Sequence, residues 1–471
     1  MKRSLEVAII GAGTAGLAAR REVARVTDNY AVIDAGPLGT TCARVGCMPS
    51  KALIQVAEDY QRRKVFDEMG IRGHLSLDSS AVMKHVRKLR DRFVKSVLAD
   101  MESWLEGHWI QKRARFVSPN VLDLEGEQIE AKKIILATGS RPLIPHAWQK
   151  YSSYFLNTDD FFEMEDLPRK IAVIGLGVIG IELGQALQRL GVEVVGFEAR
   201  RNIGGVTDPE ISNYVVESFS REMNLHFSGA DILGEGSKGL RIRSGDYEEE
   251  FEKVLIAVGR KPNLDHLGLA EIGVPLNEKG LPELIKGTYQ IKKFPIYVVG
   301  DANGERPVLH EAADEGRIAG YNSVRDESQC FTRRVSLGIV FCDPNIAVVG
   351  QTYQSLQAMG ADFITGSVSY EGQGRAIVKL KEKGLVHIYA HRSSGLLLGA
   401  EIFAPEGEHL AHLLSWAISL HLNVFDVLKM PFYHPVLEEG LRTALRHLAE
   451  KVEKEKPPLE IWRCQDAPVG A

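Results

Sequence analysis

Two segments of the chain share one pattern, in which a short apolar run ends in a glycine-rich turn and is followed by an amphipathic stretch and a second apolar run. The apolar runs that precede the turns are residues 6–10 and 170–174. The turns contain Gly11, Gly13 and Gly16 in the first segment and Gly175, Gly177 and Gly180 in the second. A short apolar run that gives way to helical spacing predicts a strand followed by a helix. Each segment is therefore predicted to form a βαβ unit.

Three further apolar runs end at or just before a glycine and are predicted to be buried strands. They are residues 134–139, residues 254–259 and residues 296–299. The first two follow the two βαβ units at comparable distances along the chain. The two parts of the sequence therefore share a second feature besides the glycine turn, a predicted buried strand that ends in glycine.

The pattern changes beyond about residue 340, where the sequence contains no further glycine turn of this kind. Apolar runs in this part predict strands at residues 346–349, 376–380, 385–390 and 395–402. Amphipathic stretches predict two helices, near residues 407–421 and 435–452. This part is predicted to be an α+β domain, and the whole chain an α/β protein with two Rossmann-like domains before it.

Composition and charge exclude several classes of partner. The chain has 471 residues, of which 44% are hydrophobic, and its net charge of −5 gives no global field that would attract nucleic acid. The basic stretch at residues 84–95 has apolar residues at helical spacing, so its cations are predicted to form the solvated face of a helix. No apolar run approaches the roughly 18 residues that a membrane span requires, and the N-terminus lacks a signal-peptide pattern. We expect a cytoplasmic protein without nucleic-acid or membrane partners.

The glycine turns predict nucleotide binding. Each turn lies between a predicted strand and a predicted helix, and Asp34 or Glu198 ends the next strand, 23 residues after the first glycine. Such a turn lets the backbone approach a pyrophosphate at the helix N-terminus, and the acidic side chain can bind ribose hydroxyls. Two nucleotide sites in one chain indicate electron transfer between two cofactors. Glu198 would repel a 2′-phosphate, which favours NAD over NADP, although Arg200 and Arg201 nearby would weaken this preference.

A close pair of cysteines follows the first βαβ unit. Cys42 and Cys47 lie five residues apart, and Lys51 comes four residues later. In a reducing compartment such a pair is more often catalytic or metal-binding than structural, but zinc would need two further ligands, and no second Cys or His pair is near. No metal is therefore expected. Two interpretations stay open: a small-loop disulfide whose thiolate Lys51 stabilises, and two free buried cysteines beside a surface lysine.

These motifs together resemble those of the pyridine nucleotide–disulfide oxidoreductases, and the resemblance covers the whole chain. It implies a glutathione-reductase-like fold that binds FAD and NAD, with Asp34 standing where the family usually has Glu. The residues it implies for FAD are Gly11, Gly13, Gly16, Asp34, Thr41, Thr138, Gly139, Gly300 and Asp301. The residues it implies for NAD are Gly175, Gly177, Gly180, Glu198, Gly259 and Arg260.

Within this family the motifs look most like those of dihydrolipoyl dehydrogenases. The resemblance implies that Cys42 and Cys47 form a redox-active disulfide, that Lys51 pairs with Glu182, and that His434 is an acid–base catalyst oriented by Glu439. It implies the oxidation of dihydrolipoyl groups to lipoyl groups, with electrons passed through the cysteine pair and FAD to NAD⁺. The substrate would be a lipoylated protein or a small dithiol. Because the family's histidine enters the other subunit, a homodimer with shared active sites is expected.

The resemblance also implies where the domains begin and end. We expect a first part of an FAD-binding domain at residues 1–147 and an NAD-binding domain at 148–267. A second part of the FAD-binding or central domain is expected at 268–339, and a dimerisation domain at 340–471.

Departures from the family pattern leave the substrate less certain than the reaction type. Thr41 and Arg44 replace the family's usual residues around the first cysteine, and Val436 replaces a common Thr. Arg44 stands where a thiol substrate or its carrier could contact it. The alternatives are an NAD(P)H-dependent reductase of another disulfide and a flavoprotein NADH oxidase or transhydrogenase. The intact cysteine pair and the His434–Glu439 motif argue against the oxidase and the transhydrogenase.

Overall fold

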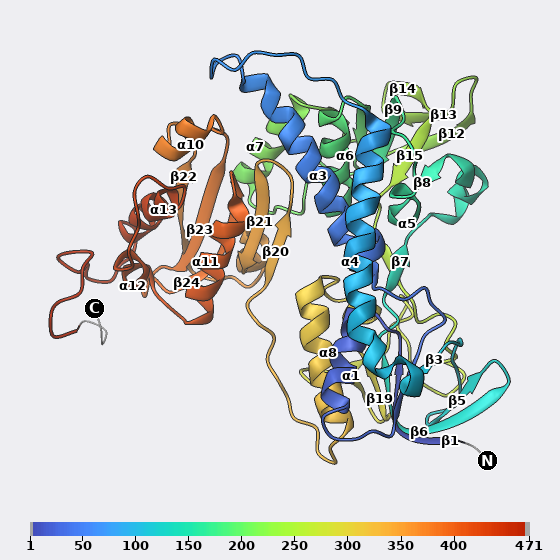
Figure 1. Cartoon of the computed structure of the whole chain (residues 1–471). Helices are drawn as coiled ribbons and strands as arrows, with labels where there is room; N and C mark the ends of the chain where they lie inside the picture. Colours follow the sequence, from blue (N-terminus) through green and yellow to red (C-terminus); the bar gives the residue numbers. More distant parts are fainter. Residues whose placement is uncertain (1–2, 467–471) are drawn as a thin grey trace.

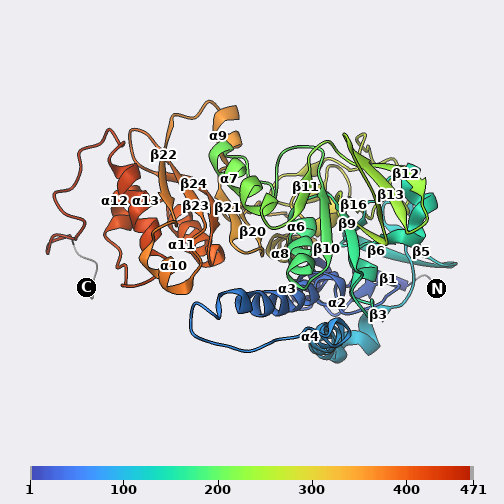
Figure 2. The same cartoon turned by 90° about the horizontal axis from the view of Figure 1, so that it is seen from above.

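The computed structural model describes residues 3–466, which form three regions, each built around a sheet (Figure 1). Seen from the front and from above, the C-terminal sheet and its helices stand to one side of the other two regions (Figures 1 and 2). Among the described residues, no helix has the length and apolar character that a membrane crossing requires.

The largest sheet has a parallel centre, in which β1 (Arg3–Ile10) lies between β2 (Tyr30–Ile33) and β6 (Glu127–Leu136). β19 (Ile296–Val298) pairs with β6 in the same direction, although the whole second sheet lies between these two strands in the sequence. The central strands are continuous apolar runs because both of their faces are buried. The remaining strands of this sheet are β3 (Trp109–Ile110), β4 (Arg115–Ser118), β5 (Val121–Leu124), β17 (Leu284–Ile285) and β18 (Gln290–Ile291).

Helices α1 (Thr14–Val23) and α8 (Leu309–Ser323) lie together on one face of this sheet. Their backbones approach closely because Gly316 has no side chain, and a Cβ at that position would lie 2.1 Å from the Ala15 carbonyl oxygen. Three further helices of this region are α2 (Thr41–Val45), α3 (Cys47–Gln61) and α4 (Ser79–His108). Short 3-10 helices cover Arg62–Val65, His146–Tyr154 and Gly300–Asn303.

The second sheet contains the other βαβ unit. β9 (Lys170–Ile174) lies between β10 (Glu193–Phe197) and β15 (Lys253–Ile256), and all three strands are parallel. The sheet is completed by β8 (Phe155–Leu156) and β11 (Asn224–His226), and its helices are α5 (Thr158–Phe161), α6 (Val178–Arg189) and α7 (Pro209–Ser220). The small antiparallel sheets are β12 (Asp231–Glu235), β13 (Leu240–Ser244) and β14 (Tyr247–Phe251), and β16 (Arg260–Pro262) paired with β7 (Ser140–Pro142).

The third sheet is antiparallel and has its own apolar core. Its strands, in spatial order, are β20 (Leu337–Val340), β21 (Asn345–Gly350), β24 (Leu397–Ala404), β23 (Leu385–His391) and β22 (Phe363–Ser369). Its helices are α9 (Tyr353–Ala358), α10 (Gly374–Lys379), α11 (Gly407–Ser419), α12 (Val424–Leu428) and α13 (Glu439–Ala449). Buried residues of α11 and α13 pack on this sheet, so the third region is α+β as the sequence predicts.

Both predicted βαβ units are confirmed, and so is the helix predicted around residues 84–95, which lies within α4. The strand predicted at residues 376–380 is wrong, because these residues belong to α10 and its C-cap. The Gln373 side chain accepts a hydrogen bond from the Ala376 N–H at 2.7 Å and caps the helix, which ends at Leu380 in the left-handed region. The helix expected near 435–452 begins later, at Glu439.

Candidate active site

The first glycine turn joins β1 to α1 at the carboxyl end of β1, a central strand of the large sheet. A Cβ on Gly11 would lie 2.3 Å from the Ala137 carbonyl oxygen, so only glycine allows this approach between neighbouring strands. The Asp34 carboxylate at the end of β2 accepts hydrogen bonds from the Ala12 N–H at 2.6 Å and the Gly36 N–H at 2.7 Å. The acidic residue is therefore fixed beside the turn, at the position where a ribose would lie.

A cavity of about 520 Å³ opens at this turn. Its walls include the turn itself, Asp34, Thr41, Arg44 and the Thr138–Gly139 motif. The Thr138 hydroxyl oxygen is buried and has no hydrogen-bond partner among the described residues, so it can bind a polar group in the cavity. The turn, the acidic residue and this hydroxyl fit a dinucleotide such as FAD. Arg44 belongs to the wall of this cavity.

The second glycine turn repeats this geometry between β9 and α6. A Cβ on Gly175 would lie 2.5 Å from the Ala257 carbonyl oxygen. Glu198 accepts hydrogen bonds from the Leu176 N–H and the Ala199 N–H, both at 2.8 Å. The carboxylate therefore binds the turn as Asp34 binds the first one, and these residues fit a second dinucleotide. A glutamate at this point disfavours a 2′-phosphate.

A hydrogen-bonded chain links the two nucleotide regions. The Ser140 hydroxyl donates to Asp301 Oδ2 at 2.7 Å, and Arg260 Nε donates to the same hydroxyl at 2.8 Å. A second guanidinium nitrogen of Arg260 donates to the Ser140 carbonyl oxygen at 2.8 Å. Asp301 was predicted to bind the FAD ribityl chain and Arg260 to bind NAD, and the structure brings both to the β7–β16 junction.

The two cysteines lie at the joint between α2 and α3. Cys42 is in α2, and Cys47 is the first residue of α3. Both are free thiols and partly buried. A hydrogen bond between the two sulfurs lowers the pKa of Cys47 to about 7 and raises the pKa of Cys42, and the nearby Lys51 cation also favours the Cys47 thiolate. Cys47 is therefore the sulfur that ionises near neutral pH.

Lys51 and Glu182 form the ion pair that the sequence predicts. Lys51 Nζ lies 2.9 Å from Glu182 Oε2, and the Glu182 side chain is only 4% exposed. Lys51 follows Cys47 by one helical turn of α3, whereas Glu182 comes from α6 of the second sheet. The Phe341 N–H donates to Glu182 Oε1 at 2.9 Å, and the Phe341 ring lies 4.6 Å from Lys51 Nζ. Three regions of the chain therefore meet beside the cysteine pair.

His434 and Glu439 also lie together as predicted. His434 Nδ1 is 3.0 Å from Glu439 Oε1, and the Val436 N–H donates to Glu439 Oε2 at 3.2 Å. The hydrogen bond from His434 lowers the pKa of Glu439, so the carboxylate is charged and orients the ring. The His434 side chain is 80% exposed. Its other ring nitrogen therefore faces outward, free to exchange a proton with a bound group.

The cysteine pair and the histidine pair lie in different parts of the chain. α2 and α3 pack with α4 and α6, whereas α13 packs against α12, β22 and β23. Both views place α3 and α13 well apart (Figures 1 and 2). Within one chain, the residues around the cysteine pair contact one another, and so do His434 and Glu439. The two groups of residues are separate from each other.

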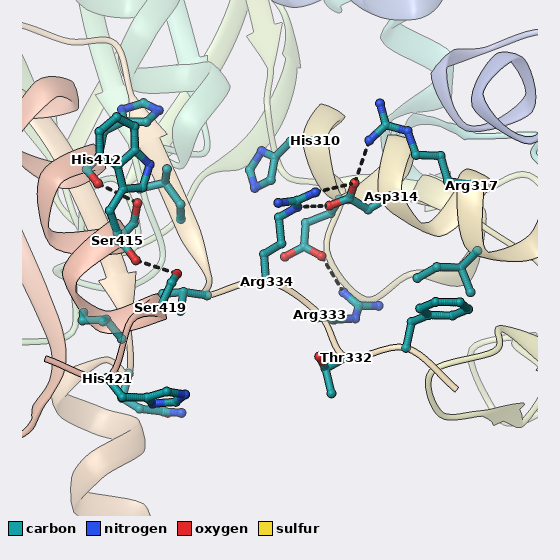
Figure 3. A pocket seen from close by; sticks show the side chains of 18 of the residues that line it. His310, Asp314, Arg317, Thr332, Arg333, Arg334, His412, Ser415, Ser419 and His421 are labelled. Atoms are coloured by element: carbon teal, nitrogen blue, oxygen red, sulfur yellow. Dashed lines mark hydrogen bonds and ion pairs between the residues drawn. The ribbon is translucent and has the colours of Figure 1, made fainter. Parts of the chain in front are cut away.

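A cavity of about 1230 Å³ lies between α8 and α11 (Figure 3). His310, Asp314 and Arg317 line it from α8, and Arg333 and Arg334 line it from the connection to the third sheet. On the α11 side, Trp416 is 63% exposed and Leu420 70% exposed. None of the residues predicted from the sequence lines this cavity, and its exposed apolar border is typical of a surface that another molecule covers.

Sequence reasoning missed several residues of the site. Ser140 connects Asp301 to Arg260, and Phe341 touches both members of the lysine–glutamate pair. The Asn263 side chain donates to the Thr138 carbonyl oxygen at 3.0 Å and lines the first cavity. Ser140 directly follows the Thr138–Gly139 motif, and that adjacency was the one available signal. Phe341 carried no signal in the sequence.

Comparison with known proteins covers almost the entire chain. A family model described as "Pyridine nucleotide-disulphide oxidoreductase" matches residues 5–316. A second model, described as "Pyridine nucleotide-disulphide oxidoreductase, dimerisation domain", matches residues 337–445. The matched regions contain the cysteine pair, both glycine turns and the His434–Glu439 pair.

Curated relatives and solved structures agree with these models. The chain is 29% identical to the dihydrolipoyl dehydrogenase of Bacillus subtilis (strain 168) over 449 residues, which is 92% of this chain and 93% of the relative. It is 28% identical to the mercuric reductase of Bacillus cereus, over 95% of this chain and 72% of the relative. The crystal structure of LpdA from Mycobacterium tuberculosis matches with a TM-score of 0.83 and 23% identity, over 94% of this chain and 99% of LpdA. The HOCl-induced flavoprotein disulfide reductase RclA from Escherichia coli matches with a TM-score of 0.80 and 19% identity, over 94% of this chain and 99% of RclA. These structures share the fold, which is glutathione-reductase-like.

Proposed function

Because the chain belongs to the pyridine nucleotide-disulphide oxidoreductase family, and is thus a flavoprotein disulfide oxidoreductase, we propose that it oxidises dihydrolipoyl groups to lipoyl groups with NAD⁺. The observation that carries the proposal is the arrangement of Cys47, Lys51 and Glu182 at the joint between α2 and α3, where Thr41 and Arg44 of α2 line the cavity at the first glycine turn. A thiol with its pKa near 7, next to a lysine whose charge is held by a buried carboxylate, suits reversible thiol–disulfide exchange.

The exchange begins with a Cys42–Cys47 disulfide and a substrate dithiol. His434 removes a proton from one substrate thiol, and the resulting thiolate attacks Cys42, which breaks the Cys42–Cys47 bond and releases Cys47 as a thiolate. The second substrate thiol then displaces Cys42: its own proton passes to the Cys47 thiolate, and the leaving Cys42 sulfur takes up the first proton from His434. The substrate leaves as a disulfide, and the protein holds the two electrons as a dithiol.

The residues of the first glycine turn, with Asp34, Thr138 and Asp301, would hold FAD, and those of the second turn, with Glu198, would hold NAD. Members of this family typically bind FAD and NAD(P). When bound, FAD supplies the two-electron chemistry that connects the dithiol to NAD⁺. The chain's own contribution is to keep Cys47 ionised through Lys51, and to favour NAD over NADP through Glu198.

We further propose that the active unit is a homodimer in which His434 of one chain serves the cysteine pair of the other. Three observations support this. The chain has a matched dimerisation domain, the His434 side chain is 80% exposed, and the cavity between α8 and α11 has an exposed apolar border at Trp416. A second copy would cover this border and bring the two halves of the chemistry together.

The substrate class is proposed from the relatives and from the site. Several curated relatives at 27–29% identity are dihydrolipoyl dehydrogenases, so a lipoylated protein or a small dithiol is the first candidate. A reductase of another disulfide is the second, because a mercuric reductase matches at nearly the same identity. Arg44 lines the first cavity, which makes the cofactor its nearest proposed contact and removes the main reason to expect an altered substrate.

The test is anaerobic reduction of NAD⁺ by free dihydrolipoamide on the purified holoprotein. NADP⁺ is run alongside, as is NADPH with oxidised glutathione. Fast turnover with NAD⁺ and slow turnover with NADP⁺ would support the proposal and the role of Glu198. If NADH bleaches the bound flavin but dihydrolipoamide gives no turnover, the substrate assignment is wrong and the reductase is the better description.

A further inference from the structure

The connection between α8 and β20, residues 324–336, leads from the first region to the third and carries an arginine, Arg333, that is held by the first region. Arg333 is 20% exposed, and its guanidinium reaches three carboxylates. Its nitrogens lie 2.5 Å from Glu305, 3.4 Å from Glu311 and 2.7 Å from Glu315. The same guanidinium lies 5.4 Å from the centre of the Tyr289 ring. Figure 3 shows Arg333 on this connection, reaching toward α8.

Glu315 is the buried member of this cluster. Its side chain is 2% exposed, and Oε2 accepts hydrogen bonds from the Gly300 N–H and the Asn303 side chain, both at 2.7 Å. The remaining oxygen, Oε1, makes no hydrogen bond to the described residues and lies 2.7 Å from the Arg333 guanidinium. Glu315 therefore joins Arg333 to the loop that begins at Gly300 and carries Asp301, the residue proposed to bind the FAD ribityl chain.

Burial raises the pKa of Glu315 to about 7, and Arg333 opposes this rise. The groups that face Glu315 are Arg333 from the connection, Tyr289 from the turn before β18, Glu305 from the loop before α8, and Glu311 from α8 itself. Glu311 has a second partner, Arg306, at 2.9 Å. Without Arg333, Glu315 would be a buried carboxylate close to two others, with no cation in contact.

We propose that Arg333 positions the FAD site: it neutralises Glu315, and Glu315 in turn holds the Gly300–Asp301 loop in the conformation that binds the cofactor. FAD binding and docking of residues 324–336 against α8 and the loop before it are then coupled. This inference rests on the proposed binding of FAD at the first glycine turn. Arg333 acts through Glu315 and does not itself touch the cofactor.

The pH dependence follows from the sign of the Glu315 shift. A carboxyl group whose pKa is raised by burial favours the buried arrangement less as the pH rises through that pKa. Removal of Arg333 raises the pKa further. The loss of FAD affinity should therefore be small at pH 6, where Glu315 is protonated with or without Arg333. It should be large at pH 9, where the buried Glu315 carboxylate is charged in the wild type and Arg333 compensates that charge.

The experiment compares FAD retention in holoproteins of the wild type and of Arg333→Met, by ultrafiltration of diluted protein and absorbance of the free flavin. We expect the dissociation constant of Arg333→Met to rise by about tenfold or more at pH 9 and by less than about twofold at pH 6. The matched control is Arg334→Met, because Arg334 is the next residue but pairs with Asp314 and is 72% exposed. That control should retain FAD like the wild type at both pH values.

The double variant Arg333→Met/Glu315→Gln separates this coupling from a general loss of folding. An amide at position 315 can still accept the hydrogen bonds from Gly300 and Asn303 but carries no charge. We expect the double variant to recover FAD retention at pH 9 and to lose the pH dependence of FAD affinity. The effects of the two substitutions are then strongly non-additive in a double-mutant cycle. As a second readout, removal of FAD from the wild type should increase hydrogen exchange in residues 324–336.

Two results would overturn the inference. One is an Arg333→Met protein that retains FAD like the wild type at pH 9, and the other is a double variant that is no better than Arg333→Met. A wild-type protein that does not bind FAD at all would instead contradict the proposed function. The two failures are therefore distinguishable in the same titration.

Discussion

The two halves of the proposed chemistry differ sharply in their surroundings within one chain. The half with Cys47 and Lys51 is enclosed: Glu182, on the second region, is 4% exposed and is contacted by Lys51 of the first region and Phe341 beside the third sheet. The half with His434 and Glu439 is open, and the His434 side chain is 80% exposed. Each half has its internal hydrogen bonds in place. Under the proposed homodimer, folding of one chain completes the cysteine half, whereas the histidine half is completed when a second chain binds.

The difference also concerns what sets the chemistry of each half. The Cys47 sulfur owes its lowered pKa to its hydrogen bond with Cys42 and to the Lys51 cation, both of which are supplied by its own chain. Glu439 orients the His434 ring, but the described part of the chain leaves this ring exposed to solvent. A proton acceptor in bulk water gives little rate advantage until a partner surface excludes solvent and brings substrate to it. Substitutions in the two halves should therefore impair turnover in different ways.

The largest expected effect comes from Cys47→Ser, because a hydroxyl cannot form the disulfide. NAD⁺ reduction by dihydrolipoamide should fall by at least about a thousandfold. Bleaching of the bound flavin by NADH should persist, because that step does not use the cysteines. The control is Cys330→Ser, an exposed thiol away from the site. Substantial dithiol-dependent turnover in Cys47→Ser would contradict the role of the pair.

His434→Gln should have the next largest effect. Loss of the proton acceptor should reduce turnover by about a hundredfold or more, while the Cys47 pKa and the flavin spectrum stay unchanged. His74→Gln, at an exposed position in the segment before α4, is the matched control. The assay is steady-state dihydrolipoamide oxidation from pH 6 to pH 9. A variant that keeps the wild-type rate and pH profile would remove His434 from the mechanism.

Mixed dimers test whether the two halves come from different chains. A dimer of one Cys47→Ser chain and one His434→Gln chain contains one complete site if the halves are shared and none if each chain is self-sufficient. With two affinity tags for purification, we expect about half of the wild-type turnover per dimer. Mixed dimers as inactive as the parent variants would show that one chain supplies both halves of its own site.

The smallest effect concerns the electrostatics of the enclosed half. Lys51→Met removes a cation that favours the Cys47 thiolate, so the pKa of Cys47 should rise by about one unit from its value of about 7. The rate of alkylation at Cys47, followed by mass spectrometry against pH, reports this change directly. Lys51→Arg keeps the charge and should leave the profile nearly unchanged. An unchanged profile in Lys51→Met would mean that the Cys42 hydrogen bond alone sets the pKa.

Much of the fold was predictable because its signals are local in sequence. The glycine turns and the acidic residue of each βαβ unit lie within about 25 residues of one another, as the dinucleotide motif requires. The pairing of His434 with Glu439 spans five residues. The prediction of a strand at residues 376–380 is wrong because a short apolar run with β-branched residues is compatible with both a strand and a short capped helix. There the Gln373 cap decided the outcome.

The links between regions could not be predicted in the same way. Ser140 and Asp301 are 161 residues apart, and Phe341 and Glu182 are 159 apart. Such contacts depend on how the sheets pack, and a serine or a phenylalanine alone carries no motif. The roles assigned to individual residues and the domain boundaries stay predictions, whereas the family and the fold are established by the matches over both parts of the chain.

The position of β19 and α8 has a consequence for synthesis of the chain. β1 and β6 can pair early, but β19 and the helix that covers α1 emerge only after the whole second sheet has been made. At about 5–20 residues per second, the ribosome needs roughly 8–30 s to pass from the end of β6 to β19. The small-residue face of α1, with Ala15 and Ala19, stays uncovered during that interval. The nascent chain therefore passes through a stage in which the second region is complete and the first still needs protection from aggregation.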